Sequence, residues 1–192
     1  MKSKKKVFVT VLCAAALVVA SVLGTMAYLT SQTKTVTNTF TVGNVAITLD
    51  ETDVTPMGVK DTDARVKGNE YKLIPGHTYI KDPTVHVDTD SEESWLFVKV
   101  VDEIAGIEAD TTVAAQMADN GWTAVDGATN VYAYKAKVTA GQDINVFENF
   151  TIKGTAAVAD YAGKTITVEA YAIQADGFDT AAAAWEAAPG WN

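Results

Sequence analysis

Cysteine is almost absent from this chain of 192 residues: the single cysteine, Cys13, lies in an apolar run near the amino terminus. Residues 28–192 therefore form no disulfide and hold no cysteine-ligated metal, so their stability must come from a buried core. Histidine is nearly as rare, with only His77 and His86. No serine lies in a G-x-S-x-G context, so the residues of a nucleophilic active site are missing. The sequence predicts no catalytic residue.

The first 27 residues have the three parts of an export signal. Four lysines lie between residues 2 and 6, an uncharged apolar run covers residues 7–23, and small residues surround the bond between Ala27 and Tyr28. The apolar run partitions into the bilayer while the lysines stay on the cytoplasmic side. We expect a signal peptidase to remove this segment, which before cleavage is the only part that meets a membrane.

Two alternatives apply to the same segment. Residues 7–29 carry no charge and are long enough to span a bilayer core of about 30 Å if they are not cleaved. Cys13 would suit a lipid anchor, but it follows the bulky Leu12 and lies in the middle of the run. The alanine-rich run and the small residues at 24–27 favour cleavage.

Positive charge is scarce beyond the predicted cleavage site. Residues 28–192 contain 11 basic and 24 acidic side chains, a net charge of −13. Such a surface repels phosphate backbones and anionic lipids, so we expect neither nucleic-acid binding nor membrane-surface docking. It also opposes the association of like copies.

Residues 28–41 form a threonine-rich segment. Threonine recurs at alternate positions, which suits an extended strand, yet the segment offers few apolar side chains to bury. An edge strand, a flexible tail and a strand that completes another molecule are the alternatives. The residues that we expect to act as such a donor strand are Thr33, Thr35, Val36, Thr37 and Thr39.

The rest of the chain, residues 42–192, is predicted to be one all-β domain. Residues 50–70 are polar and contain Pro56, Gly58 and Gly68, which is typical of an exposed connection. Two short helices are expected, one capped by Asp110 and one by Asp179. Short strands separated by turns predict an antiparallel β-sandwich of the jelly-roll kind. The expected strands are residues 45–49, 84–87, 95–101, 122–125, 131–138, 144–152 and 164–174.

Carboxylates and histidines supply the only candidates for a metal site. An acidic loop before residue 94 suits calcium, although it lacks the glycine and final glutamate of an EF-hand. The two histidines are nine residues apart and lack the H-E-x-x-H spacing of a zinc peptidase. We therefore expect no cofactor, with calcium as an alternative. The weak metal candidates are His77, His86, Asp88, Asp90 and Glu92.

Several stretches resemble one known family. The chain is similar to exported proteins that the SipW-type signal peptidase of Gram-positive bacteria processes, the TasA/camelysin (CalY) group. The stretches that carry the resemblance are residues 26–31 (MAYLTS), 39–45 (TFTVGNV), 71–76 (YKLIPG), 81–83 (KDP), 95–101 and 171–178.

This resemblance implies a secreted jelly-roll sandwich in the extracellular matrix or at the cell surface of a Gram-positive bacterium. In the group's matrix members, the amino-terminal segment of one copy adds as a strand to the next, and fibres of a biofilm form. Mapped onto this chain, the donor is residues 28–41 and the partner is a second copy or another matrix protein. The camelysin branch implies instead a surface metallopeptidase that would use His77, His86 and nearby acids. A monomeric surface protein that binds sugar or protein is a third alternative.

Overall fold

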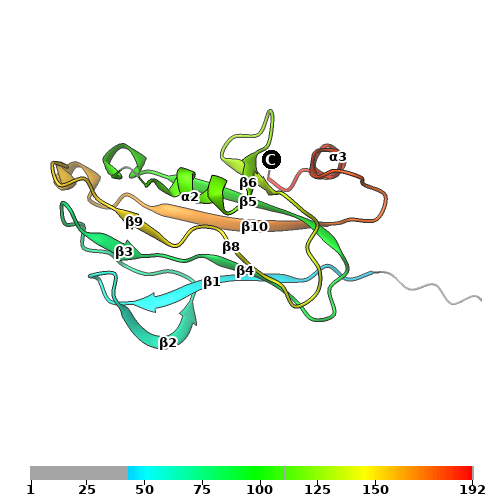
Figure 1. The fold of residues 1–192 in the computed structure, drawn as a ribbon, viewed down its shortest axis with the longest axis horizontal. Coiled ribbons are helices and arrows are strands. Elements are labelled where there is room, and N and C mark those ends of the chain that lie inside the picture. Colours follow the sequence, from blue (N-terminus) through cyan, green and yellow to red (C-terminus); the bar gives the residue numbers. More distant parts are fainter. Residues whose placement is uncertain (1–42, 110, 192) are drawn as a thin grey trace, which may run out of the picture. The chain divides into compact units, whose positions relative to one another are not determined.

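The computed structural model describes residues 43–109 and 111–191, which belong to one unit of the chain (Figure 1). The predicted signal peptide and the predicted donor segment lie outside the described residues. The strands are β1 (Ile47–Val54), β2 (Lys60–Val66), β3 (Thr78–Ile80), β4 (Thr84–Val87), β5 (Ser94–Asp102), β6 (Trp122–Ala124), β7 (Val131–Tyr134), β8 (Asp143–Asn145), β9 (Asn149–Thr151) and β10 (Ile166–Gln174). The helices are α2 (Val113–Asp119) and α3 (Ala181–Ala187), with 3-10 turns η1 (Ala105–Ile107) and η2 (Val158–Tyr161).

The strands form three antiparallel sheets. One has the order β2-β1-β4-β8, the second has the order β10-β5-β7-β6, and β3 pairs with β9 in a third. Figure 1 shows β1 and β4 in one layer, with β5 and β10 in the other. The prediction of an all-β fold with two short helices is confirmed.

Side chains from both four-stranded sheets meet in one core. The alternation of strand residues sends Val85 and Val87 of β4 inward from one layer, and Leu96 and Val98 of β5 inward from the other. The largest fully buried side chains of this core are Tyr79, Leu96, Met117, Phe147, Phe150 and Ile152.

The strand β5 is buried on both faces. Its other face carries Trp95 and Phe97, which α3 covers with Trp185. The rings of Phe97 and Trp185 have centroids 5.1 Å apart. This double burial explains the nearly continuous apolar run of β5.

Both helix caps differ from the prediction. The hydroxyl of Thr112 accepts a hydrogen bond from the Ala115 amide, and the hydroxyl of Thr180 accepts one from the Ala183 amide. Threonine therefore begins each helix, one or two residues after the expected aspartates, Asp110 and Asp179.

The expected connection at residues 50–70 is wrong, because it contains the second half of β1 and all of β2. Six of the seven residues of β2 are exposed, so the strand shows no alternation of apolar and polar residues. Its turn is fixed by Gly58, which has a φ of +68° and lies against Tyr79, where a Cβ atom would come within 2.7 Å of the tyrosine. The hairpin is formed by backbone pairing and by this close approach, and neither produces a hydrophobic pattern in the sequence.

The predicted strand at residues 144–152 is two strands in different sheets. β8 pairs with β4, whereas β9 pairs with β3. Between them the Val146 amide donates to the Pro83 carbonyl, and Val146 and Phe147 are fully buried. Apolar residues therefore occur on both strands and between them, because the crossing segment also passes through the core.

Candidate functional site

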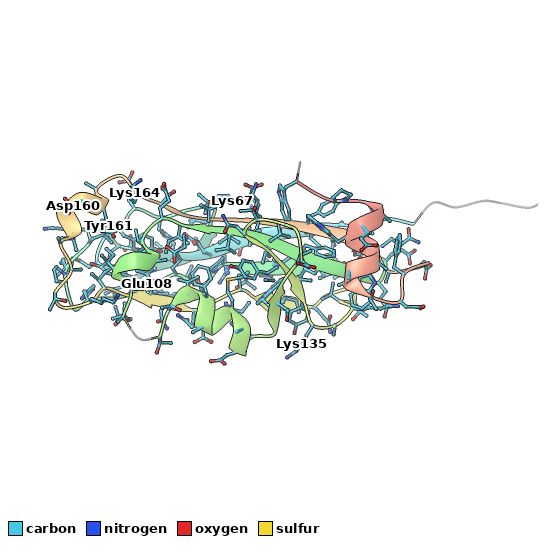
Figure 2. The ribbon with its side chains drawn as sticks, turned by 90° about the horizontal axis from the view of Figure 1, so that it is seen from above. Lys67, Glu108, Lys135, Asp160, Tyr161 and Lys164 are labelled. Carbon is cyan, nitrogen blue, oxygen red and sulfur yellow. The ribbon has the colours of Figure 1, made fainter. Side chains whose placement is uncertain are left out.

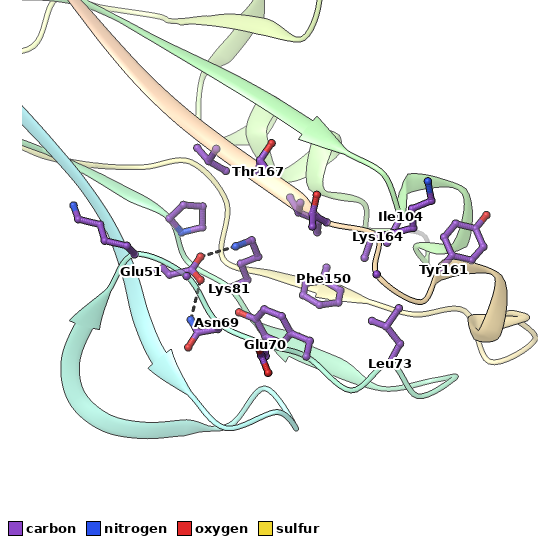
Figure 3. Close-up of a pocket in the computed structure, with 18 of the residues that line it drawn as sticks. Glu51, Asn69, Glu70, Leu73, Lys81, Ile104, Phe150, Tyr161, Lys164 and Thr167 are labelled. Atoms are coloured by element: carbon purple, nitrogen blue, oxygen red, sulfur yellow. Dashed lines mark hydrogen bonds and ion pairs between the residues drawn. The ribbon is translucent and has the colours of Figure 1, made fainter.

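A groove lies between β1 and β10, and Figure 3 shows it from close by. It has a volume of about 1050 Å³. One wall is formed by residues 49–51 of β1 and by residues 67–73, which follow β2, and the other by residues 161–168. Ile104, Lys81 and Phe150 also line it. We call this feature the β1–β10 groove.

One wall of the groove is an open sheet edge. β10 is the last strand of its sheet. Just before β10, the Glu103 amide donates a hydrogen bond to the Thr165 carbonyl, so these two residues form a hydrogen-bonded pair. Bonded and non-bonded pairs alternate in an antiparallel ladder, so odd-numbered residues of β10 direct their main chain to β5. The even-numbered residues direct it outward, where no described residue bonds it. These residues are Ile166, Val168, Ala170, Ala172 and Gln174.

The opposite wall is open over the first half of β1. The Asp88 amide bonds the Ala46 carbonyl, so even-numbered residues of β1 turn their main chain to β4. Ile47 and Leu49 turn theirs to the other side, where β2 pairs with β1 only from Glu51 onward. At this edge the ammonium of Lys67 donates to the Leu49 carbonyl. A lysine thus takes the place of a neighbouring strand at one main-chain acceptor.

The groove exposes part of the hydrophobic core. The side chains concerned pack against the buried core, yet they are only partly covered themselves. Covering these side chains would be favourable, because each Å² of apolar surface removed from water contributes roughly 25 cal/mol. The groove-lining members of this set are Leu49, Tyr71, Leu73, Val158, Tyr161, Ile166 and Val168.

A charged cluster of three residues interrupts this apolar surface. The Lys81 ammonium lies 2.6 Å from Glu51 Oε2, and Asn69 Nδ2 donates to Glu51 Oε1 at 2.8 Å (Figure 3). The same amide donates to the Thr52 carbonyl, and its oxygen accepts from the Val54 amide. Asn69 therefore stands in for a strand partner where β1 and β2 lose their regular register. We call these three residues the Glu51–Lys81–Asn69 cluster.

A further buried carboxyl belongs to Glu108, which directly follows η1 and is labelled in Figure 2. Its Oε2 accepts from the Val113 amide at 3.0 Å, and its Oε1 has no hydrogen-bond partner among the described residues. Burial, and next the charge of Asp102, raise the pKa of Glu108 to about 7. Folding therefore favours the protonated form of this carboxyl.

The structure places the predicted metal candidates in separate surroundings. Nε2 of His86 lies 2.9 Å from Asp50 Oδ1 and its Nδ1 lies 2.6 Å from Asp143 Oδ1. Burial favours the neutral ring, but the hydrogen bonds and charges of the two carboxylates outweigh it and raise the pKa of His86. His77 instead contacts the Met57 carbonyl through Nε2. The two histidines share no partner.

The acidic loop anchors the chain. Asp88 bonds its neighbour Thr89, and its amide donates to the Ala46 carbonyl, while the Glu92 amide donates to the Asn44 carbonyl. Asp90 is exposed. Across residues 43–109 and 111–191, no three histidine, cysteine or acidic side chains are placed to hold a metal ion.

Other predicted site residues lie outside the described residues. These are the cleavage residues Ala27 and Tyr28 and the donor-strand residues Thr33, Thr35, Val36, Thr37 and Thr39. Within the described part of the chain, no helix has the length and apolar character needed to cross a bilayer.

Sequence reasoning missed the residues of the groove itself. Glu51, Lys67 and Asn69 fall in the stretch that resembled an exposed connection, and Lys81 lies just before β4. The available signal was the threonine-rich, strand-prone segment at residues 28–41, which has few apolar side chains and precedes a domain of short strands. Compared with known proteins, the chain matches no family model, no curated protein and no solved structure.

Proposed function

We propose that this protein is a secreted structural protein of the cell surface or biofilm matrix of a Gram-positive bacterium, without enzymatic activity of its own. In this proposal residues 28–41 of one copy add as a strand in the β1–β10 groove of the next copy, and fibres grow by repetition. The domain would then be a jelly-roll-like sandwich that a neighbour completes.

The observation that carries the proposal is the row of outward main-chain groups along β10, at one wall of the groove. Outward groups of β10 face a partner that the described residues do not supply, and so do those of Ile47 on β1. An added strand would satisfy these groups and cover the partly buried core side chains. A small-molecule site would not need a row of main-chain amides and carbonyls that no described residue bonds.

The donor segment fits this role in its composition. Residues 28–41 are strand-prone, contain no proline or glycine, and carry one charge, Lys34. Adding such a strand brings little like-charge repulsion of its own. The export signal that precedes it is consistent with assembly outside the cell.

A neighbouring copy is favoured over insertion into the same molecule. Before β1 the chain is tied to the acidic loop, because Asn44 and Ala46 bond Glu92 and Asp88. Residues 43–46, which these bonds hold, extend from the start of β1 in the direction away from the groove (Figure 1). From Gly43 to Leu49 the strand covers about 20 Å at 3.3 Å per residue. The segment would have to reverse completely to reach its own groove.

The test compares the mature chain, residues 28–192, with a form that lacks residues 28–41. Size-exclusion chromatography and negative-stain electron microscopy should show polymers for the first and monomers for the second. Adding a peptide of residues 28–41 in excess should cap the grooves and shorten the polymers. If both forms are monomers of equal size, the proposal is wrong.

A further inference from the structure

The β1–β10 groove contains one polar position in an apolar channel. Glu51 is 4% exposed and Lys81 is 8% exposed, so the charged pair is buried although it lines the groove. Leu49 precedes Glu51 by two residues on β1 and lines the groove on one side of the pair, while Figure 3 shows Phe150 and Leu73 on the other side. An occupant of the groove therefore meets an apolar, a polar and again an apolar surface.

The Lys81 ammonium has hydrogen-bonding capacity left over. It carries three N–H donors, and its only side-chain partner in the described part of the chain is Glu51. A strand that placed an apolar side chain against it would exclude water and leave the remaining donors unpaired. A side chain with a carbonyl oxygen would satisfy them.

The donor segment has a matching pattern on one face. Side chains two residues apart share a face of a strand, about 6.6 Å apart. The even-numbered positions near the end of the segment read Val36, Asn38 and Phe40, an amide between two apolar residues. The odd-numbered positions 29–41 hold a leucine, a serine and five threonines.

We infer that Asn38 is the residue that sets the register of the donor strand, through a hydrogen bond from Lys81 to its amide oxygen in the Glu51–Lys81–Asn69 cluster of the next copy. This inference rests on the proposed function. Val36 and Phe40 then cover the apolar surfaces on the two sides of the cluster. The pattern is symmetric about Asn38, so it fits whichever direction the strand runs.

The test uses the mature chain and measures the lowest protein concentration at which polymer sediments. Asn38→Val should raise this concentration about tenfold, because the Lys81 donors lose their partner. Thr37→Val is the matched control, since residue 37 lies on the opposite face and should leave the concentration unchanged. Both substitutions lie outside the described core, so the folded domain should stay intact.

An exchange of two residues separates register from composition. The variant Val36→Asn with Asn38→Val has the same composition, but a two-residue slip that restores the amide places Lys34 against the apolar wall. We expect it to assemble as poorly as Asn38→Val. In a background with Glu51→Gln and Lys81→Met, Asn38→Val should no longer weaken assembly, provided that circular dichroism shows this background to be folded.

The outcomes distinguish the inference from the proposed function. If wild type polymerises and Asn38→Val or the exchanged variant assembles equally well, the register inference is wrong and strand addition stands. An equal loss with Thr37→Val would also overturn the inference, because it would show a general demand for polar residues. If wild type forms no polymer, both fail together.

Discussion

At the scale of single residues, the structure isolates Glu108 as a buried acid. It is 2% exposed, and one carboxyl oxygen lacks a partner in the described part of the chain. The carboxylate of Asp102 repels its charge, and Lys153 attracts it more weakly. Folding therefore favours the protonated form.

Replacing Glu108 tests this directly. The raised pKa means that the folded state binds the proton more tightly than the unfolded chain, so its contribution is present below about pH 4.5 and is lost as the pH rises through about 7. The rise from 4.5 to about 7 corresponds to roughly 3 kcal/mol. Glu108→Gln should increase the free energy of unfolding by roughly 2–3 kcal/mol at pH 8 and little at pH 4.

Urea denaturation at a series of pH values measures this difference. Glu103→Gln is a suitable control, because this carboxylate is exposed and its pKa is lowered, first by hydrogen bonding to the Thr165 amide and hydroxyl and then by the charge of Lys164. A uniform change in stability of Glu108→Gln across the pH range would contradict the assignment.

At the scale of elements, the two sides of β10 differ because the described residues supply a hydrogen-bonded partner on one side only. Glu169 directs its amide to Lys99 of β5, whereas Ala170 directs its amide to the open edge. Glu169 therefore has the more constrained backbone of the two residues, although its side chain is exposed. Side-chain exposure alone would rank the two residues in the opposite order.

Proline at each position should separate these roles. Ala170→Pro removes an N–H that has no partner in the described residues, so the melting temperature should change little. Glu169→Pro breaks the ladder to β5 and should lower stability by about 1–3 kcal/mol more. Thermal unfolding followed by circular dichroism compares the two, and equal destabilisation would show that the edge of β10 is not open.

The strands could largely be predicted from the sequence where burial follows the pleat. β4, β5 and β10 alternate or run continuously apolar, and each was expected within two residues of its position. β2 could not be predicted, because its pairing with β1 is a main-chain interaction between exposed residues. The break between β8 and β9 was hidden by Val146 and Phe147, which are buried for reasons of tertiary packing.

At the scale of the whole molecule, charge opposes the proposed assembly. Residues 28–192 carry a net charge of −13, and copies in a fibre must approach closely. The Debye length falls from about 30 Å at 0.01 M salt to about 8 Å at 0.15 M. Repulsion between neighbouring copies is therefore screened under physiological conditions and strong in dilute buffer.

Polymer formation should accordingly increase with salt. Raising NaCl from 10 to 150 mM should lower the protein concentration needed for sedimentable polymer, by about tenfold if screening removes about 1.4 kcal/mol of repulsion per contact. Sedimentation over this range measures the effect. MgCl₂ and CaCl₂ at equal ionic strength should act alike, and a response to micromolar calcium alone would instead indicate a specific calcium site.

The sequence by itself determined the all-β class and the dependence on a buried core without disulfides, because alternation along a strand and the lack of cysteine are local properties of the chain. Only the tertiary structure decided which sheet edges stay open and that Glu51, Lys81 and Asn69 meet in one groove. The physical reason is that a sheet edge is open when no neighbouring strand pairs with it, which is a property of the whole sheet. No residue of β10 differs in kind from those of a strand with two partners, so its free side emerges only when the whole sheet is in place.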